Sequence, residues 1–273
     1  MQTYWHWLAL LSLAVFALER FVPRDKAQRA LRKGILTDVF YIVFNGHFLG
    51  VLVAMAATPV ARAFDAFLST LGVTLHANWL SALPLWLQFI VAFFLSDFLQ
   101  WSVHNLLHRV PFLWRIHQVH HSIVDMDFMG SMRFHFGEVI VYKSLLYVPL
   151  ALVGFSGDVL FLLAIVGTLI GHMNHANTSL RFGPFVYFFN TPQMHIWHHA
   201  HPNSDATLPR VGVNFGINLS LWDWLFGTAY LPSHDPSALG FEGIERFPED
   251  PIRQAVAPLL PAVTLAEASP KAS

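Results

Sequence analysis

Long apolar runs constrain the fold of this chain more than any other feature of its sequence. Four of them can be outlined, at Trp5–Val22, Ile35–Pro59, Leu80–Trp101 and Val139–Ile170. A helix needs about twenty mostly apolar residues to cross the hydrocarbon core of a bilayer. Charged residues make up only 12% of the chain, whereas about a quarter of an ordinary soluble domain is charged. Together these features predict an all-α integral membrane protein.

The number of membrane helices depends on how the first and last runs are interpreted. The first run has no basic residue before it and no small-residue cleavage site, which indicates a retained anchor rather than a signal peptide. The last run is interrupted by Gly154-Phe155-Ser156-Gly157-Asp158, which predicts a turn between two shorter helices, as a full or a re-entrant hairpin. We expect about four to five transmembrane or re-entrant helices in a single domain over residues 1–247. The Pro- and Ala-rich residues 248–273 are expected to form a disordered tail.

Basic residues predict the orientation of the chain in the membrane. Six Lys and Arg residues lie between the first and second runs, from Arg20 to Lys33, whereas the next loop contains only Arg62. Because Lys and Arg accumulate on the cytoplasmic side, the first loop is expected there. Counting the runs forward brings Trp101 and Gly171 to that same side. We therefore expect a cytoplasmic helical cap beyond these positions.

Histidine is unusually frequent, with 16 residues, and cysteine is absent. A metal ion bound by this chain must therefore use His, Asp, Glu or backbone oxygen. Histidines three or four residues apart share one face of a helix, so each cluster directs its imidazoles to a common point, and imidazole suits iron, zinc, copper and nickel. The clustered candidates are His104, His108, His117, His120, His121, His172, His175, His195, His198 and His199.

The clusters differ in how strongly they indicate metal binding. Two copies of H-x-x-H-H, beginning at His117 and His195, and an H-x-x-x-H at His104 are hard to explain as solvated surface in so apolar a chain. His172 and His175 alone would be read as an ordinary hydrogen-bonded pair. The isolated histidines are interpreted as interfacial or loop residues, and they are His6, His47, His76 and His234.

Several polar residues near the clusters are candidates to orient ligating imidazoles through the second ring nitrogen. Asp125 and Asp127 are interpreted instead as solvated loop charges. Asp97 lies at the end of an apolar run, where an acid is costly and usually serves structure or chemistry. The orienting candidates are Asp97, His135, Glu138, Asn177 and Asp223.

The order of these motifs resembles the signature of the fatty acid hydroxylase / sterol desaturase superfamily. The resemblance begins in Asp97–Ser122, covers about half of the chain, and continues through Arg133–Glu138, His175–Asn177, Thr191–His199, Asn214–Gly216 and Trp222–Thr228. Flanking positions depart from the usual pattern at Asn105, His135-Phe-Gly-Glu138 and Trp224, but every core histidine is present. These departures bear on substrate and partner contacts more than on the metal.

The resemblance implies a non-haem di-iron site (Fe2+/Fe3+) in a catalytic part spanning about residues 90–230. Its eight core histidines would be those of the H-x-x-x-H and the two H-x-x-H-H motifs, with His175 and His172 completing the set. The implied activity is O2-dependent hydroxylation or desaturation of a membrane lipid such as a sterol, fatty acyl chain or ether lipid. Such a reaction needs two external electrons, and the sequence has no G-x-G-x-x-G, P-loop or cysteine cluster. We expect an external donor of the cytochrome b5, ferredoxin or reductase type.

Other readings remain open at this point. A zinc-dependent membrane hydrolase would need only three protein ligands and a metal-activated water, and H-E-x-x-H is absent. A non-catalytic haem carrier would need one axial pair per haem, and a metal transporter would place its ligands in the middle of a span. The net charge of -1 gives no reason to expect nucleic acid as a partner.

Overall fold

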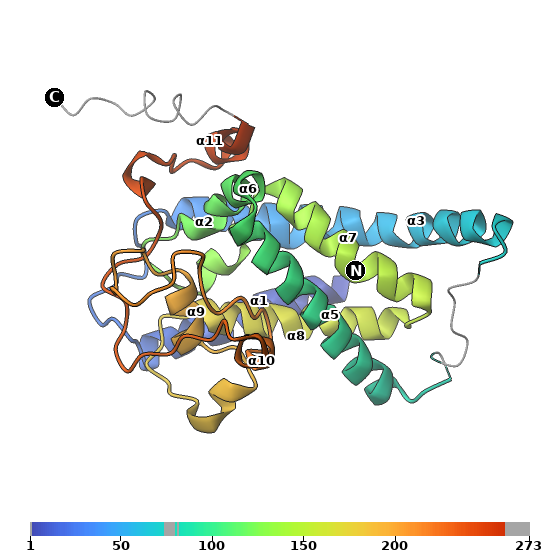
Figure 1. The fold of residues 1–273 in the computed structure, drawn as a ribbon, viewed down its shortest axis with the longest axis horizontal. Helices are drawn as coiled ribbons and strands as arrows, with labels where there is room; N and C mark the ends of the chain where they lie inside the picture. The colour runs from blue at the N-terminus through green and yellow to red at the C-terminus, as the bar shows by residue number, and fades with distance from the viewer. Residues whose placement is uncertain (1, 74–79, 81, 260–273) are drawn as a thin grey trace.

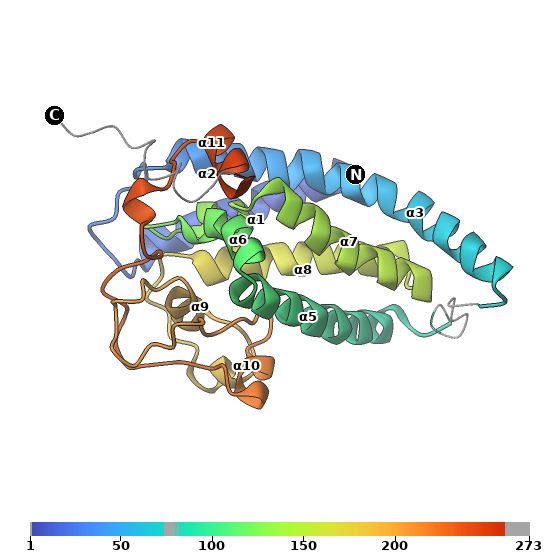
Figure 2. The same ribbon diagram turned by 45° about the horizontal axis from the view of Figure 1, so that its top comes forward.

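Helical rods that lie side by side make up most of the protein. The computed structural model describes residues 2–73, 80 and 82–259. Among these residues five rods form the body of the molecule (Figures 1 and 2). They are α1 (Gln2–Phe21), the continuous run of α2 (Ile35–Val43), the π-helical η1 (Phe44–Leu49) and α3 (Gly50–Thr70), then α5 (Leu85–Arg109), α7 (Phe136–Val153) and α8 (Gly157–His175).

Four of the described helices are long and apolar enough to cross a membrane, at Ile35–Val53, Leu85–Arg109, Phe136–Val153 and Gly157–His175. This agrees with the predicted all-α membrane fold. The first predicted span forms a 20-residue helix, α1, but it is not among these four. Its first five residues include Gln2, Thr3 and His6, and its last turn contains Glu19 and Arg20, so polar residues lie near both of its ends.

The predicted turn at residues 154–158 joins two antiparallel helices of full length. Gly154 ends α7 with φ at 106°, a left-handed conformation that glycine adopts without steric cost. Ser156 caps α8 by accepting a hydrogen bond from the backbone N–H of Val159. With 18 and 19 residues, α7 and α8 are each long and apolar enough to cross a bilayer.

The remaining elements gather at one end of the bundle, where α5 and α8 finish and α2 and α7 begin (Figures 1 and 2). We call this end the cap. It contains α6 (Pro111–His121), η2 (Phe128–Met132), η3 (Gly183–Tyr187), α9 (Pro192–His198), α10 (Leu221–Phe226) and η4 (Ile244–Arg246). Ile123, Ile196 and Trp197 form part of its apolar core.

The basic loop between α1 and α2 packs on the cap. The carboxylate of Glu19 accepts hydrogen bonds from the backbone N–H groups of Phe128 and Asn177. The backbone N–H of Arg24 donates to the carbonyl of Asn177 at 3.3 Å. The loop and the histidine-bearing segments therefore share one end of the molecule, which is the arrangement on which the predicted orientation depends.

A buried network of charges joins this loop to the start of α2. Arg32 donates to both carboxylate oxygens of Asp127, at 2.7 and 2.6 Å, and to Asp38 at 2.7 Å, while Arg133 donates to Asp38 at 2.6 Å. Asp127 is only 3% exposed, so its interpretation as a solvated loop charge is wrong. No local pattern predicts this burial, because the partner Arg32 lies 95 positions away in the chain.

The chain is still folded where the disordered tail was predicted to begin. Residues Pro251–Val256 form α11, and Ala257–Leu259 continue as the 3-10 helix η5. Gln254 is buried, accepts a hydrogen bond from the Tyr41 hydroxyl and donates to the carbonyl of Pro248. These contacts bind the segment to α2. Residues 260–273 of the predicted tail lie outside the described residues.

Candidate metal centre

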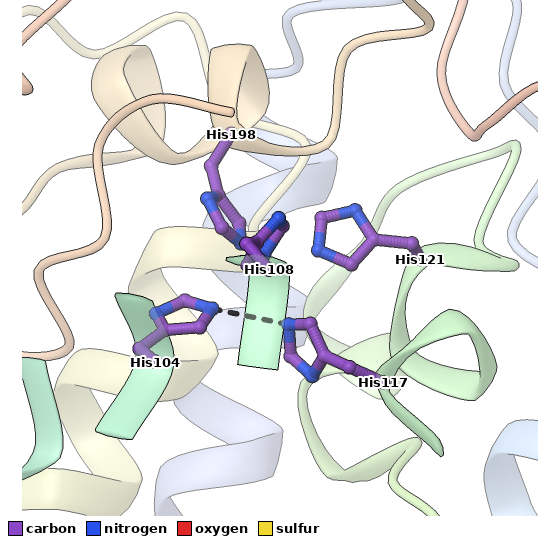
Figure 3. A group of neighbouring side chains, drawn as sticks. All are labelled: His104, His108, His117, His121 and His198. Carbon is purple, nitrogen blue, oxygen red and sulfur yellow. Dashed lines mark hydrogen bonds between the residues drawn. The ribbon is translucent and has the colours of Figure 1, made fainter. Parts of the chain in front are cut away.

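Nine histidines from α5, α6, α8 and α9 form two adjoining groups where the ends of α5 and α8 meet the cap. The ligand atoms within each group all lie within 4.8 Å of one another. Figure 3 shows the five-histidine group, in which the imidazoles converge from α5, α6 and α9 on a common centre. The five-histidine group consists of His104, His108, His117, His121 and His198, and the four-histidine group of His120, His175, His195 and His199.

Each H-x-x-H-H motif contributes to both groups. On α6, His117 and His121 join the five-histidine group, whereas His120 joins the other. At α9 the assignment is reversed, because His195 and His199 join the four-histidine group and His198 the five-histidine group. Residues four apart on a helix point almost the same way, and the residue between them points elsewhere. The motif therefore links two neighbouring centres.

Backbone carbonyls hold four of the nine imidazoles by their Nδ1 atoms. The acceptors include the carbonyl of Phe215 for His104, at 2.7 Å, and that of Val213 for His198, at 2.8 Å. The carbonyl of Arg133 accepts from His120 at 3.1 Å, and that of Gly171 from His175 at 2.8 Å. A carboxylate oxygen of Glu138 faces His117 Nδ1 at 2.8 Å. A carbonyl only accepts, so these contacts fix the proton on Nδ1 and leave Nε2 with a lone pair.

The lone pairs on these Nε2 atoms face one another inside the protein. His104 Nε2 lies 3.1 Å from His117 Nε2, and His120 Nε2 lies 3.4 Å from His175 Nε2. Two such lone pairs repel unless a cation lies between them. Ligands bonded to one ion at about 2.0–2.1 Å are separated by roughly 2.9–3.4 Å at angles of about 90–110°. Nε2 of His108, of His121 and of His198 has no hydrogen-bond partner although each atom is buried. The residues thus fit bound metal ions.

Burial keeps these imidazoles neutral. Loss of solvation lowers the pKa of His117, His120, His195 and His199 well below the usual value, and the neighbouring imidazoles lower it further. Neutral imidazole is the form that binds a metal. The facing Nε2 atoms therefore do not readily take up a proton to relieve their mutual repulsion, and they stay available as metal ligands.

His172 lies outside both groups. Its Nε2 atom faces the Ser12 hydroxyl at 3.0 Å and its Nδ1 atom the Ser131 hydroxyl at 2.7 Å. His175, three residues later on α8, points toward α9 and belongs to the four-histidine group. The two histidines of this pair thus have different environments.

Of the five orienting candidates, only Glu138 contacts a clustered histidine directly. Asp97 accepts hydrogen bonds from the backbone and side chain of Asn218, and Asp223 from the backbone N–H groups of Phe215 and Gly216. Asp223 therefore acts on His104 only through the peptide of Phe215. Burial raises its pKa, opposed by these hydrogen bonds.

The other two candidates, His135 and Asn177, form hydrogen bonds with backbone groups outside the two histidine groups. His135 caps α7 by accepting from the N–H of Gly137, and its Nε2 atom faces the carbonyl of Ala255 at 2.9 Å. Asn177 bonds to the backbone N–H and carbonyl of Asp25 and so holds the basic loop. Neither contacts the two groups.

Some contacts of the groups had no signal in the sequence. Phe134 stacks on His120, with ring centroids 4.3 Å apart, and the Asn190 amide lies 3.4 Å from His195 Nδ1. Gly212, with φ at 98°, lies so close to His108 that an added Cβ would be 3.0 Å from its Nδ1 atom. Only the folded backbone brings these residues to the histidines.

A cavity of about 180 Å³ leads from both groups into the bundle, between α5, α7 and α8. Residues of each group face it, including His104, His117 and His175. Phe93 and Leu163 line it farther along the helices. A molecule in this cavity would meet the histidine centre directly from the membrane part of the protein.

These features agree with the comparison with known proteins. The sequence profile of the family described as fatty acid hydroxylase matches residues 89–228, just over half of the chain. The protein therefore belongs to the fatty acid hydroxylase family, as the motifs predicted. Membership identifies it as a membrane-bound oxidoreductase of the lipid hydroxylase type rather than a zinc hydrolase or a haem carrier. No solved structure matches the chain.

Curated relatives extend this result. An ornithine lipid hydroxylase of Rhizobium tropici is 29% identical over 240 residues, which cover 86% of this chain and 70% of the relative. An alkylglycerol monooxygenase of Xenopus tropicalis is 26% identical, over 59% of this chain and 34% of the relative. A very-long-chain aldehyde decarbonylase of Arabidopsis thaliana is 24% identical, over 48% of this chain and 21% of the relative. The chain thus spans about a third of the length of the alkylglycerol monooxygenase and about a fifth of that of the aldehyde decarbonylase.

Proposed function

We propose that the protein hydroxylates a polar membrane lipid with O2, at a centre of two iron ions held by the five- and four-histidine groups. The supporting observation is that two buried groups of imidazoles with facing lone pairs adjoin a cavity within the membrane helices. Five imidazoles in one group exceed the four ligands that zinc usually takes in proteins. We include His175 among the ligands and leave His172 out, because both ring nitrogens of His172 face hydroxyl groups.

The iron pair, when bound, would supply the oxidising power that breaks an unactivated C–H bond, which no side chain provides. Hydroxylation consumes one O2, two electrons and two protons; one oxygen atom enters the C–H bond and the other leaves in water. Desaturation would use the same electrons but remove hydrogen from two neighbouring carbons. We favour hydroxylation because the Rhizobium tropici relative, which aligns over 86% of this chain, is named as a lipid hydroxylase. Ornithine lipid is for that reason the first substrate to test.

The protein's own residues orient the ligands and exclude water. The carbonyls of Phe215, Val213 and Gly171 fix the imidazole tautomers that point Nε2 inward. Glu138 does the same for His117 with a carboxylate. Eight of the nine histidines are at most 4% exposed and His108 is half-buried, so the protein shields the centre from bulk water.

We place the cap on the cytoplasmic side and the electron donor outside this chain, as a cytochrome b5, ferredoxin or reductase docking on the cap. The orientation rests on the basic loop from Arg20 to Lys33, which packs on the cap. An external donor is needed because this sequence has no cysteine to bind an iron–sulfur cluster and no glycine-rich dinucleotide motif. We also treat residues 1–247 as one membrane-embedded domain, which α11 covers from outside.

The test is oxygen incorporation in membranes that contain the protein. Membranes with ornithine lipid, a reductase system and isotopically labelled O2 should form a lipid that carries one labelled oxygen atom, as measured by mass spectrometry. Membranes with a His120→Ala variant at matched protein level should not. Product formed under strict anaerobiosis, or label that comes from water, would contradict the proposal.

A further inference from the structure

The wall of the cavity changes from polar to apolar along three helices at once. On each helix the residue nearer the histidines is polar and the one farther into the bundle is apolar. The pairs are Gln100 and Phe93 on α5, Glu138 and Leu146 on α7, and Asn174 and Leu163 on α8. At 1.5 Å per residue these pairs span about 10–17 Å. A cavity for a plain hydrocarbon chain would not need the polar half.

The polar half contains buried atoms that lack partners inside the protein. They are Glu138 Oε2, Tyr142 Oη, Asn174 Oδ1 and Asn218 Oδ1. The amide nitrogens of Asn174 and Asn218 already donate to the carbonyl of Ile217 and to Asp97, so the amide oxygens are the free acceptors of these two cavity-lining residues. Buried polar atoms normally have hydrogen-bond partners. These atoms are therefore positioned to accept hydrogen bonds from a ligand.

Lys143 adds a positive charge to the same wall. It lies in the interior of the α7 span and lines the cavity, with its ammonium 5.7 Å from the centre of the Tyr147 ring. Other charges inside the spans have partners, such as Asp38 with Arg133 and Glu138 with His117. In the part of the chain that the structure describes, no carboxylate lies within 4.0 Å of Lys143. An ionisable residue inside a membrane is costly and usually serves function.

We propose that the cavity binds its lipid by the polar end, with Lys143 paired to a carboxylate or phosphate of the lipid. The amide oxygens of Asn174 and Asn218 accept hydrogen bonds from N–H or O–H groups of that same polar end. The apolar chain then runs past Phe93 and Leu163 toward the bilayer, which is the natural direction for a lipid with its headgroup at the cap. This inference rests on the proposed function and specifies its substrate.

The position of Lys143 also limits where oxygen can enter. It lies five residues from Glu138 on α7, about 7–8 Å along the helix, and Glu138 contacts His117. The carbon that faces the histidines is therefore a few bonds from the anionic group. Hydroxylation falls in the headgroup or on the first carbons beside it, and not in the middle of an acyl chain.

Binding of a charged lipid and its neutral counterpart tests the ion pair. The purified holoprotein is titrated by native mass spectrometry with an N-acyl ornithine and with its methyl ester, and with phosphatidic acid and diacylglycerol. A charge-assisted contact should make one charged member bind about ten- to a hundredfold tighter than its neutral counterpart. A carboxylate preference or a phosphate preference identifies the group that Lys143 binds. Equal affinity within both pairs would overturn the proposal.

Variants at Lys143 connect the preference to this side chain. Lys143→Met should remove the preference for the charged lipid while iron content and thermal unfolding stay as in the wild type. Lys143→Arg, the matched control, should keep most of it because the charge remains. A Lys143→Met protein that keeps the full preference would contradict the assignment, and the wild-type comparison above stands even if this variant fails to fold.

The site of oxygen insertion separates this inference from the function it rests on. Tandem mass spectrometry of the product from the wild type should locate the new oxygen on headgroup fragments or on the adjoining carbons. Oxygen found deep in an acyl chain would refute the inference and leave the hydroxylase function intact. Failure of the iron-loaded wild type to oxygenate any lipid would contradict the function itself, and the inference with it.

Discussion

Replacing Glu138 by glutamine should weaken iron binding without unfolding the protein. Glu138 is 3% exposed, and its Oε1 atom lies 2.8 Å from His117 Nδ1. Glutamine has the same shape but loses the charge that stabilises His117 as a ligand. Hydrogen bonds to charged groups contribute about 1.5–3 kcal/mol, and each 1.4 kcal/mol is a factor of ten in affinity. Loss of an orienting carboxylate typically costs about ten- to a hundredfold. Because glutamine still accepts a hydrogen bond, we expect about tenfold.

The assay is competition for iron between the purified variant and a chelator, with thermal unfolding measured on the same sample. Asp97→Asn is the matched control, because Asp97 is also fully buried but bonds to Asn218 and Trp222 rather than to a histidine. This control should lower the unfolding temperature and leave the iron affinity of the folded protein unchanged. Glu138→Gln protein that binds iron as tightly as the wild type would refute the orienting role.

Three further outcomes follow from the structure. His172→Ala should keep its iron whereas His120→Ala should lose most of it, as metal analysis at matched protein level would show; loss of iron in both would place His172 in the centre after all. Arg32→Met should destabilise the protein by about 3–5 kcal/mol, because it leaves the buried carboxylate of Asp127 without its ion-pair partner and Asp38 with Arg133 alone, and denaturant unfolding measures this. A reporter fused after Gly227 should stay in the cytoplasm, and its appearance on the opposite side would contradict the proposed orientation.

The sequence was sufficient to predict the helices of the membrane part. Apolar length alone indicated α5 and the α7–α8 hairpin, because a bilayer requires helices of a minimum length. It was less informative for α1, whose apolar run was read as a span although polar residues lie near both of its ends. The helical segment at Pro251–Leu259 was missed because its stability comes from contacts with α2 and not from its own composition.

For the candidate metal centre, spacing predicted which histidines gather but not how they divide. Four-residue spacing explains why His117 and His121 stay together. The assignment of His120 to the other group depends on where α8 and α9 lie relative to α6, which no local pattern contains. Spacing alone does not separate His172 from His175; only the resemblance of His175–Asn177 to the family pattern favoured His175, which is the one that lies with His195 and His199. The cavity residue Lys143 had no motif, because its role depends on an interior that three separate helices enclose.

Metal content with an optical spectrum tests the central claim most directly. Protein purified from membranes under mild conditions, reconstituted with ferrous iron and freed of loosely bound ions, should contain two iron ions per chain and show no Soret band. Two variants test the division into groups. His198→Ala removes a member of the five-histidine group and should lower the iron content toward one ion per chain, whereas His6→Ala lies outside both groups and should keep two. A single zinc ion per chain, a Soret band, or no retained metal would contradict the account.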